Sequence, residues 1–409
     1  MTLLCRLLAI IPLYFIGKEF VGRKLSFWAI LVLIMLPYPA KTGADALRDW
    51  PHILFLTTGF LFLLLGAKQD KCWLFGVAGL AAGLGHIIRP ECAQLVVYGG
   101  LWLAWNLGWP KRGVTRARLA LALVVLVAGF CIPAGPYMRM KGKILPKKAK
   151  ALIGFVQSLQ SDEVSESRVD KASDGKDIAA VAPTNVVKAF GKLAKRVSEN
   201  LMYFFVPALL IGIYYHFRKQ PKGMERFFVA AFVLFNVTIL VLLYCISDYM
   251  SRRHALPLAV MTIFYVPVGL QISADWLSIR FSEGRAGNNL KPQMWFFILV
   301  AVGVVICLPK LVRPLRIEKQ GYRDAAEWLR ENTAAEDVVA VPDIRISFYG
   351  ERKGLGYGSK VPKQAKYVVR IVKDEDEKPE FGRTVQEKYS VWVDRRKKSG
   401  KRLVIYKMR

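Results

Sequence analysis

A short polar segment, residues 41–49, separates two long apolar runs and carries two acids and two bases. Asp45 and Asp49 are four residues apart, so they share a face if the segment is helical, and Arg48 lies beside them. Ionisable groups at the ends of membrane segments are costly unless they are paired or functional. Two carboxylates beside a guanidinium are suited to hold a divalent cation or a phosphate, so we expect part of a site here, at a membrane surface.

Other charged residues end later apolar runs. They are Arg89, Glu91, Asp248, Arg252, Arg253 and His254. One interpretation is that each side chain only reaches water or pairs with a neighbour. The other is a phosphate site, because a guanidinium is a planar fork that matches phosphate oxygens. We therefore predict that the substrate-binding residues are Arg48, Arg89, Glu91, Arg252 and Arg253, and that Asp45 and Asp49 are supporting acids or metal ligands.

The histidines and cysteines show no metal-binding pattern. His254 is expected to be a packed or helix-capping residue, not a ligand, and His52, His86 and His216 have no partner pattern. The six cysteines lie in or at the ends of apolar runs without CxxC or His-paired spacing. We expect them to act as small hydrophobic residues in helix packing, not as zinc ligands or disulfides.

Long apolar segments must position these charged residues. The hydrophobic fraction is 54%, the mean hydropathy is +0.28 and the formal net charge is +29. Together they favour an integral membrane protein with basic loops over a soluble globule, and we expect no nucleic-acid partner. The apolar runs predict about ten transmembrane helices, near residues 2–16, 26–40, 51–66, 73–88, 92–108, 118–138, 201–217, 227–247, 254–272 and 293–309.

The lysines and arginines of the short loops predict the orientation. Alternate loops carry sixteen of these bases and the opposite loops carry five. Because the more basic loops face the cytoplasm, residues 41–49, 139–200 and 310–409 are predicted to share the outer side, together with the amino terminus.

Two further segments differ from the apolar core (residues 1–310). Residues 139–150 hold six bases and no acid, and 186–197 show amphipathic helical spacing; both suit anionic lipid headgroups, although a solvated loop is an alternative for the former. Residues 311–409 read as a small extracytoplasmic α+β domain, with a helix at 322–331 and strands at 337–341, 367–372, 389–393 and 402–406. We expect no catalysis in this domain, because it has no phosphate loop, Cys/His set or Ser/His pair.

Several segments in order resemble the membrane core of family 39 glycosyltransferases. They are residues 6–24, 44–51 (Ala-Asp-Ala-Leu-Arg-Asp-Trp-Pro), 76–91 ending in Arg-Pro-Glu, 251–257 (Ser-Arg-Arg-His-Ala-Leu-Pro) and 321–329. This family comprises dolichyl-phosphate-mannose–protein mannosyltransferases and bacterial relatives that modify lipid A, with the GT-C fold. The resemblance implies transfer of a hexose or pentose from a polyprenyl-phosphate sugar to a lipid, glycan or protein, and it implies that the membrane is the inner or plasma membrane of a bacterium. By family position, Asp45 and Asp49 match the second acidic loop, which supports the site or a metal.

The resemblance also implies a departure from the family. Family members begin with an earlier helix and an acidic outer loop that carries the principal base, whereas Met1 here falls in the second span. We therefore expect a fragment that lacks this helix and loop, and that is inactive as written. Two other classes stay open. One is a lipid or sugar transporter or flippase, and the other is a non-catalytic envelope membrane protein.

Overall fold

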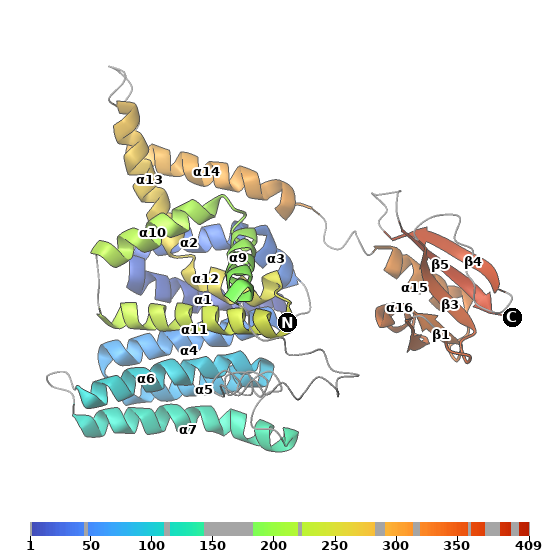
Figure 1. Ribbon diagram of the computed structural model, residues 1–409, viewed down its shortest axis with the longest axis horizontal. Helices are drawn as coiled ribbons and strands as arrows, with labels where there is room; N and C mark the ends of the chain where they lie inside the picture. The colour runs from blue at the N-terminus through green and yellow to red at the C-terminus, as the bar shows by residue number, and fades with distance from the viewer. Residues whose placement is uncertain are drawn as a thin grey trace. The chain divides into compact units, whose positions relative to one another are not determined.

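The computed structural model divides the chain into two compact units, Met1–Val312 and Arg313–Arg409 (Figure 1). The structure describes residues 2–44, 48–109, 115–142, 183–219, 223–282, 291–313, 320–358, 361–372, 385–393 and 401–408. Most of the first unit is helical and most of its interior is apolar. The predicted fold class, a polytopic helical core followed by a small domain with a sheet, is confirmed.

The first half of the helical unit is a layered stack. Its elements are α1 (Thr2–Val21), α2 (Arg23–Met35), α3 (Pro37–Ala44), α4 (Asp49–Gln69), α5 (Cys72–Ile88), the 3-10 helix η1 (Pro90–Ala93), α6 (Gln94–Gly108) and α7 (Arg116–Lys141). Figure 1 shows α4 to α7 lying side by side. Gly79 on α5 and Gly129 on α7 allow the two backbones to approach closely, because a Cβ on Gly79 would lie 2.2 Å from the backbone oxygen of Leu126.

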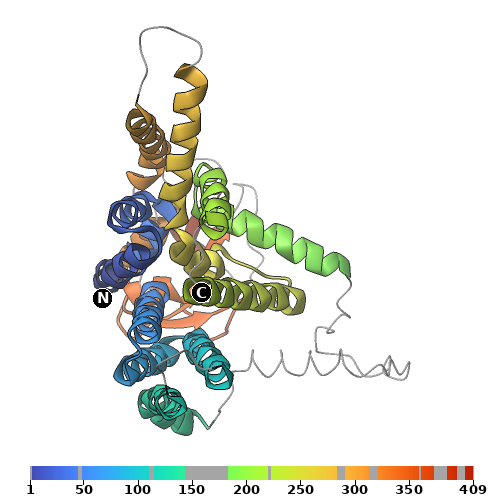
Figure 2. The same ribbon diagram turned by 90° about the vertical axis from the view of Figure 1, so that its left-hand side faces the viewer.

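The second half contains α9 (Pro183–Asn200), α10 (Phe205–Lys219), α11 (Gly223–Ser247), α12 (Arg252–Thr262), α13 (Tyr265–Ser282) and α14 (Pro292–Leu311). Figure 2 shows α9 and α10 leaving their junction in different directions. The contact between α10 and α13 again depends on glycine. A Cβ on Gly269 would lie 1.8 Å from the backbone oxygen of Ala208, and one on Gly212 would lie 1.9 Å from that of Tyr265.

Two of the expected spans are bent pairs of helices, and a third bent pair joins the amphipathic segment in α9 to the expected span 201–217. The axis turns by 65° between α2 and α3, by 108° between Val186–Asn200 and Phe205–Arg218, and by 61° between α12 and α13. The first bend follows from Pro37, which has no N–H and forces Leu36 into an extended conformation. At the second bend, Met202 and Tyr203 have positive φ angles of 57° and 59°.

Apolar helices long enough to cross a membrane recur through this unit. Among the described residues, four single helices meet that standard by length and composition, and the three bent pairs raise the number to seven. All ten apolar runs predicted from the sequence lie on described helices or bent pairs, and the total of about ten crossings stays a prediction. The basic run at 143–150 lies outside the described residues, whereas the amphipathic segment 186–197 is part of α9.

The second unit packs helices α15 (Gln320–Asn332) and α16 (Ile344–Tyr349) on a five-stranded sheet. The strands are β1 (Val338–Val341), β2 (Lys353–Gly356), β3 (Tyr367–Val372), β4 (Val385–Trp392) and β5 (Arg402–Met408), in the order β2-β1-β3-β5-β4. β1 is parallel to β2 and β3, and β5 is antiparallel to β3 and β4. The predicted helix and four strands are present, whereas α16 and β2 were not predicted from the sequence.

An ion pair ties the start of β1 to the start of β3 in this unit. Lys366 Nζ lies 2.7 Å from Asp337 Oδ1, and the backbone N–H of Ala334 donates to Oδ2 at 3.0 Å. Burial acts to raise the pKa of Asp337, but the hydrogen bonds from Lys366 and Ala334 outweigh it and hold the pKa below its ordinary value.

Candidate functional site

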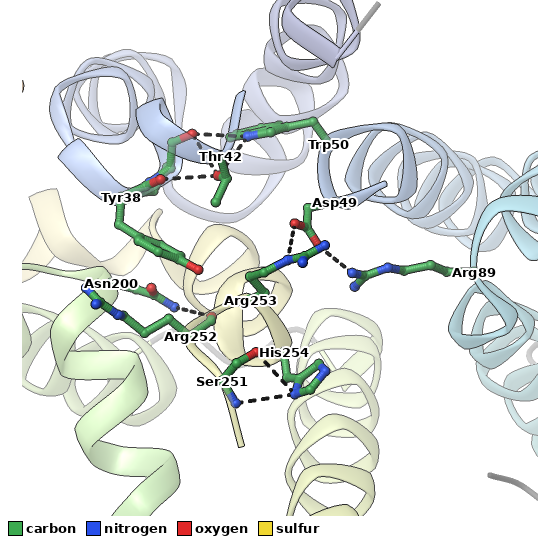
Figure 3. A network of polar contacts seen from close by, with 11 residues as sticks. Tyr38, Thr42, Asp49, Trp50, Arg89, Asn200, Ser251, Arg252, Arg253 and His254 are labelled. Atoms are coloured by element: carbon green, nitrogen blue, oxygen red, sulfur yellow. Dashed lines mark hydrogen bonds and ion pairs between the residues drawn. The ribbon is translucent and has the colours of Figure 1, made fainter. Parts of the chain in front are cut away.

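Asp49 is the centre of a polar cluster at the ends of the apolar helices (Figure 3). Its side chain is only 1% exposed. Arg89 donates from Nη2 to Oδ1 of Asp49, and Arg253 donates from Nε to Oδ2 at 2.8 Å. One buried carboxylate is therefore held between two guanidinium groups that come from distant parts of the sequence.

Three helix termini bring these residues together. α4 begins at Asp49, and Pro51 fits its first turn because a proline N–H is not needed there. Arg89 is an extended residue between the end of α5 and the start of η1 at Pro90. Arg253 lies in the first turn of α12, which is fixed by a capping box between Ser251 and His254. His254 is thus a capping residue, as predicted.

The cluster carries excess positive charge. Arginine is always protonated, so Arg89, Arg253 and Asp49 together have a charge of +1. The side chains of Arg89 and Arg253 are 17% and 38% exposed. Each guanidinium has five N–H groups and contacts Asp49 through one nitrogen among the described residues, so the pairing with Asp49 does not use all of its donors.

Arg252 turns to a second acid. Its Nε lies 3.3 Å from Oε2 of Glu199 at the end of α9, and its guanidinium lies 5.1 Å from the ring centre of Tyr38 on α3. Asn200 donates from Nδ2 to the backbone oxygen of Arg252 at 3.1 Å. The two adjacent arginines therefore connect α12 to α4 on one side and to α9 and α3 on the other (Figure 3).

A buried contact between α3 and α4 supports the carboxylate. Trp50, next to Asp49, donates from Nε1 to the backbone oxygen of Pro39 at 3.1 Å and to Thr42 Oγ1 at 3.2 Å. Arg6 of α1 lies 5.7 Å from the centre of the Trp50 ring. These contacts fix the helix start that carries Asp49.

The other predicted residues stand as follows. Arg48 and Glu91 are exposed, and Asp45 lies outside the described residues. The substrate-binding roles of Arg48, Arg89, Glu91, Arg252 and Arg253 stay predictions. So does a cation at Asp45 and Asp49; within the described residues no three His, Cys, Asp or Glu side chains gather, and both oxygens of Asp49 already accept from arginines.

A cavity lies at the opposite ends of α4 to α7, far from this cluster along each helix. Its lining includes Asp70, Trp102, Asn106 and Arg118. It contains none of the predicted site residues.

Three residues near the cluster make contacts that were not predicted from the sequence. Glu199 and Tyr38 contact Arg252, and nothing local in the sequence indicates either contact. His52, for which the sequence analysis found no partner pattern, has its Nδ1 3.1 Å from Cys92 Sγ. A signal for this contact was present, since His52 follows Asp49 by three residues and Cys92 follows Arg89 by three.

Comparisons with known proteins agree with this architecture. Residues 1–134 match the family model described as dolichyl-phosphate-mannose-protein mannosyltransferase. Two crystal structures of ArnT from Cupriavidus metallidurans are similar over almost the whole chain. The apo structure gives a TM-score of 0.53 at 13% identity and covers 99% of this chain and 82% of ArnT. The structure bound to undecaprenyl phosphate gives 0.52 at 12% identity, with 98% and 82% covered.

These findings define the class of protein. At such low identity the likeness to ArnT shows the fold, which is that of a GT-C glycosyltransferase, and the protein is an integral membrane protein. The match over the first 134 residues supports the assignment to family 39 glycosyltransferases that the resemblance predicted. No curated protein matches the chain by sequence.

Proposed function

We propose that this chain is a membrane glycosyltransferase that takes a sugar from a polyprenyl-phosphate donor and transfers it to a lipid, glycan or protein on the outer side of the membrane. The observation that carries the proposal is the buried Asp49 held between Arg89 and Arg253 at the ends of apolar helices. One related structure, ArnT, is of a complex with undecaprenyl phosphate.

A lipid phosphate suits this cluster for three reasons. The +1 charge of Asp49, Arg89 and Arg253 favours an anion, and both partly exposed arginines have N–H groups, beyond the one bonded to Asp49, that can donate to phosphate oxygens. The amino terminus of α12, which begins at Arg252, adds partial positive charge. The neighbouring apolar helix surfaces suit the prenyl chain.

In the proposed reaction, an acceptor hydroxyl attacks the anomeric carbon with inversion. The bond between that carbon and the phosphate oxygen breaks, polyprenyl phosphate leaves, and the hydroxyl proton passes to a carboxylate. Arg89 and Arg253 stabilise the charge that develops on the leaving phosphate. Asp49 organises the two arginines instead of accepting the proton, because both of its oxygens are already occupied. Exposed Glu91 contacts the substrate.

The test is donor binding by proteoliposomes that contain the full chain, with transfer measured in parallel; the expectation that the chain is inactive as written predicts binding without transfer. A radiolabelled polyprenyl-phosphate sugar is the donor, and membrane lipid and protein extracts are the acceptors. Arg253→Gln removes a charged donor to phosphate and should weaken donor binding about 10- to 100-fold, since such hydrogen bonds contribute about 1.5–3 kcal/mol. Arg218→Gln, an exposed base on α10, is the matched control. Translocation of the intact donor without transfer, or equal donor binding by Arg253→Gln and Arg218→Gln, would contradict the proposal.

A further inference from the structure

A second contact runs beside the Asp49–Arg89 ion pair and joins the same two parts of the chain. Cys92 Sγ of η1 lies 3.1 Å from Nδ1 of His52 on α4, and the two residues are 0% and 2% exposed. His52 follows Asp49 by three residues, and so lies on the same face of α4. Cys92 likewise follows Arg89 by three. The two pairs therefore form adjacent cross-links between α4 and the turn that carries Arg89.

The turn around Arg89 is tightly packed and hydrogen-bonded. The N–H of Arg89 donates to the backbone oxygen of Gly85 at 2.8 Å, and the N–H of Cys92 donates to that of Arg89 at 3.2 Å. A Cβ added to Gly85 would lie 2.4 Å from Cys92 Sγ and 3.0 Å from the Cβ of Phe55 on α4. The thiol thus fills the space that glycine leaves between α4, α5 and η1.

A hydrogen bond between the thiol and the imidazole holds Cys92 against His52. A neutral thiol can donate to an unprotonated ring nitrogen, and both groups are buried where an unsatisfied polar atom is costly. Displacement of η1 from α4 would separate Cys92 from His52 and leave Nδ1 without this partner. Packing and hydrogen bonding therefore favour the same position of the turn.

We infer that the His52–Cys92 contact is a positioning element for the donor site, because it fixes the turn that places Arg89 on Asp49. This inference rests on the proposed role of Arg89 as a phosphate ligand. A shift of about 1 Å in a positioned group can reduce function about 100-fold, so loss of the contact should be measurable in donor binding.

The experiment measures the binding of undecaprenyl phosphate alone to the full chain in detergent, together with thermal unfolding. Cys92→Ala should raise the Kd, up to the about 10- to 100-fold that loss of a charged hydrogen bond from Arg89 would cause. Cys92→Ser, which keeps a donor, should recover most of the affinity. Cys307→Ala is the matched control, because Cys307 is a buried thiol on α14, and its Kd should stay within about twofold of the native value.

A second variant tests the same turn without changing the thiol. Gly85→Ala should push Cys92 away and weaken binding, whereas Gly135→Ala should not, because a Cβ there meets nothing within 4 Å. In an Arg89→Ala background, Cys92→Ala should have no further effect on the Kd, because it acts through Arg89.

The outcomes separate the two proposals. If the native chain does not bind undecaprenyl phosphate, the proposed function fails and the inference fails with it. If the native chain binds, Arg89→Ala does not, and Cys92→Ala and Gly85→Ala bind normally, the donor site stands and the positioning role is refuted. A fall in thermal stability of Cys92→Ala with an unchanged Kd also refutes it, since the contact would then serve folding only.

Discussion

Replacement of Asp49 by Asn should damage stability more than removal of either arginine. Asp49 is 1% exposed, and its charge compensates two guanidinium groups. Loss of one partner of a buried ion pair typically costs about 3–5 kcal/mol. Arg89 and Arg253 are 17% and 38% exposed and can turn partly toward water, so we expect about 2–4 kcal/mol for Asp49→Asn. Arg253→Ala leaves the Asp49–Arg89 pair intact and should cost about 1 kcal/mol.

The assay is equilibrium unfolding in mixed detergent micelles, with undecaprenyl phosphate binding measured on the same preparations. Asp49→Asn and Arg253→Ala should rank in opposite order in the unfolding measurement and in the binding measurement. Asp49→Asn lowers stability most, whereas Arg253→Ala lowers affinity with a small loss of stability. A double variant, Asp49→Leu with Arg89→Leu, should regain part of the stability because no buried charge is left uncompensated between them, yet it should not regain binding.

The reasoning is refuted if Asp49→Asn unfolds at the same denaturant concentration as Arg253→Ala. That result would mean that the carboxylate does not compensate both arginines in the folded protein. Asp49→Glu is the control, since it keeps the charge and lengthens the side chain by one methylene. Its stability should lie between those of the native chain and Asp49→Asn.

Three further predictions follow from other parts of the chain. Gly269→Ala should destabilise the first unit by about 1–3 kcal/mol because the added methyl group meets a backbone oxygen of α10, whereas Gly135→Ala, in open space, should unfold like the native chain. The second unit should lose stability as the pH falls through the folded-state pKa of Asp337, which lies below the ordinary 3.8; Asp337→Asn should remove this acid-dependent loss, and circular dichroism against pH checks it. An impermeant maleimide should label Glu327→Cys in intact cells and Arg226→Cys only after permeabilisation; the reverse pattern would contradict the predicted orientation.

The sequence predicted the helical architecture well because membrane helices satisfy their own backbone hydrogen bonds and must be apolar over long stretches. It did not predict the bend of 61° between α12 and α13, since the break at 263–264 has no proline or glycine of its own. In the second unit, β3 was predicted to the residue. β2 was missed because two of its four residues are glycines, which are rare in strands, and α16 was missed because it is a helix of only six residues.

The site was predictable in its residue types but not in its pairings. Asp49, Arg89 and Arg253 were candidates because each ends an apolar run. That Arg253 bonds to Asp49, 204 residues away, depends on how the helices pack, and no local spacing records it. The position of Glu199 beside Arg252 has the same origin, because it depends on how α9 packs against α12.

The adjacency of Arg252 and Arg253 has a consequence for how this region can vary between relatives. Consecutive residues at a helix start point about 100° apart, which is what lets one arginine reach α9 and the next reach α4. A residue inserted between Arg252 and Arg253 would turn one of the two side chains by about 100° around the helix axis and detach its ion pair. The spacing of these two positions along α12, more than the length of the connection before them, therefore holds the helix between α4 and α9.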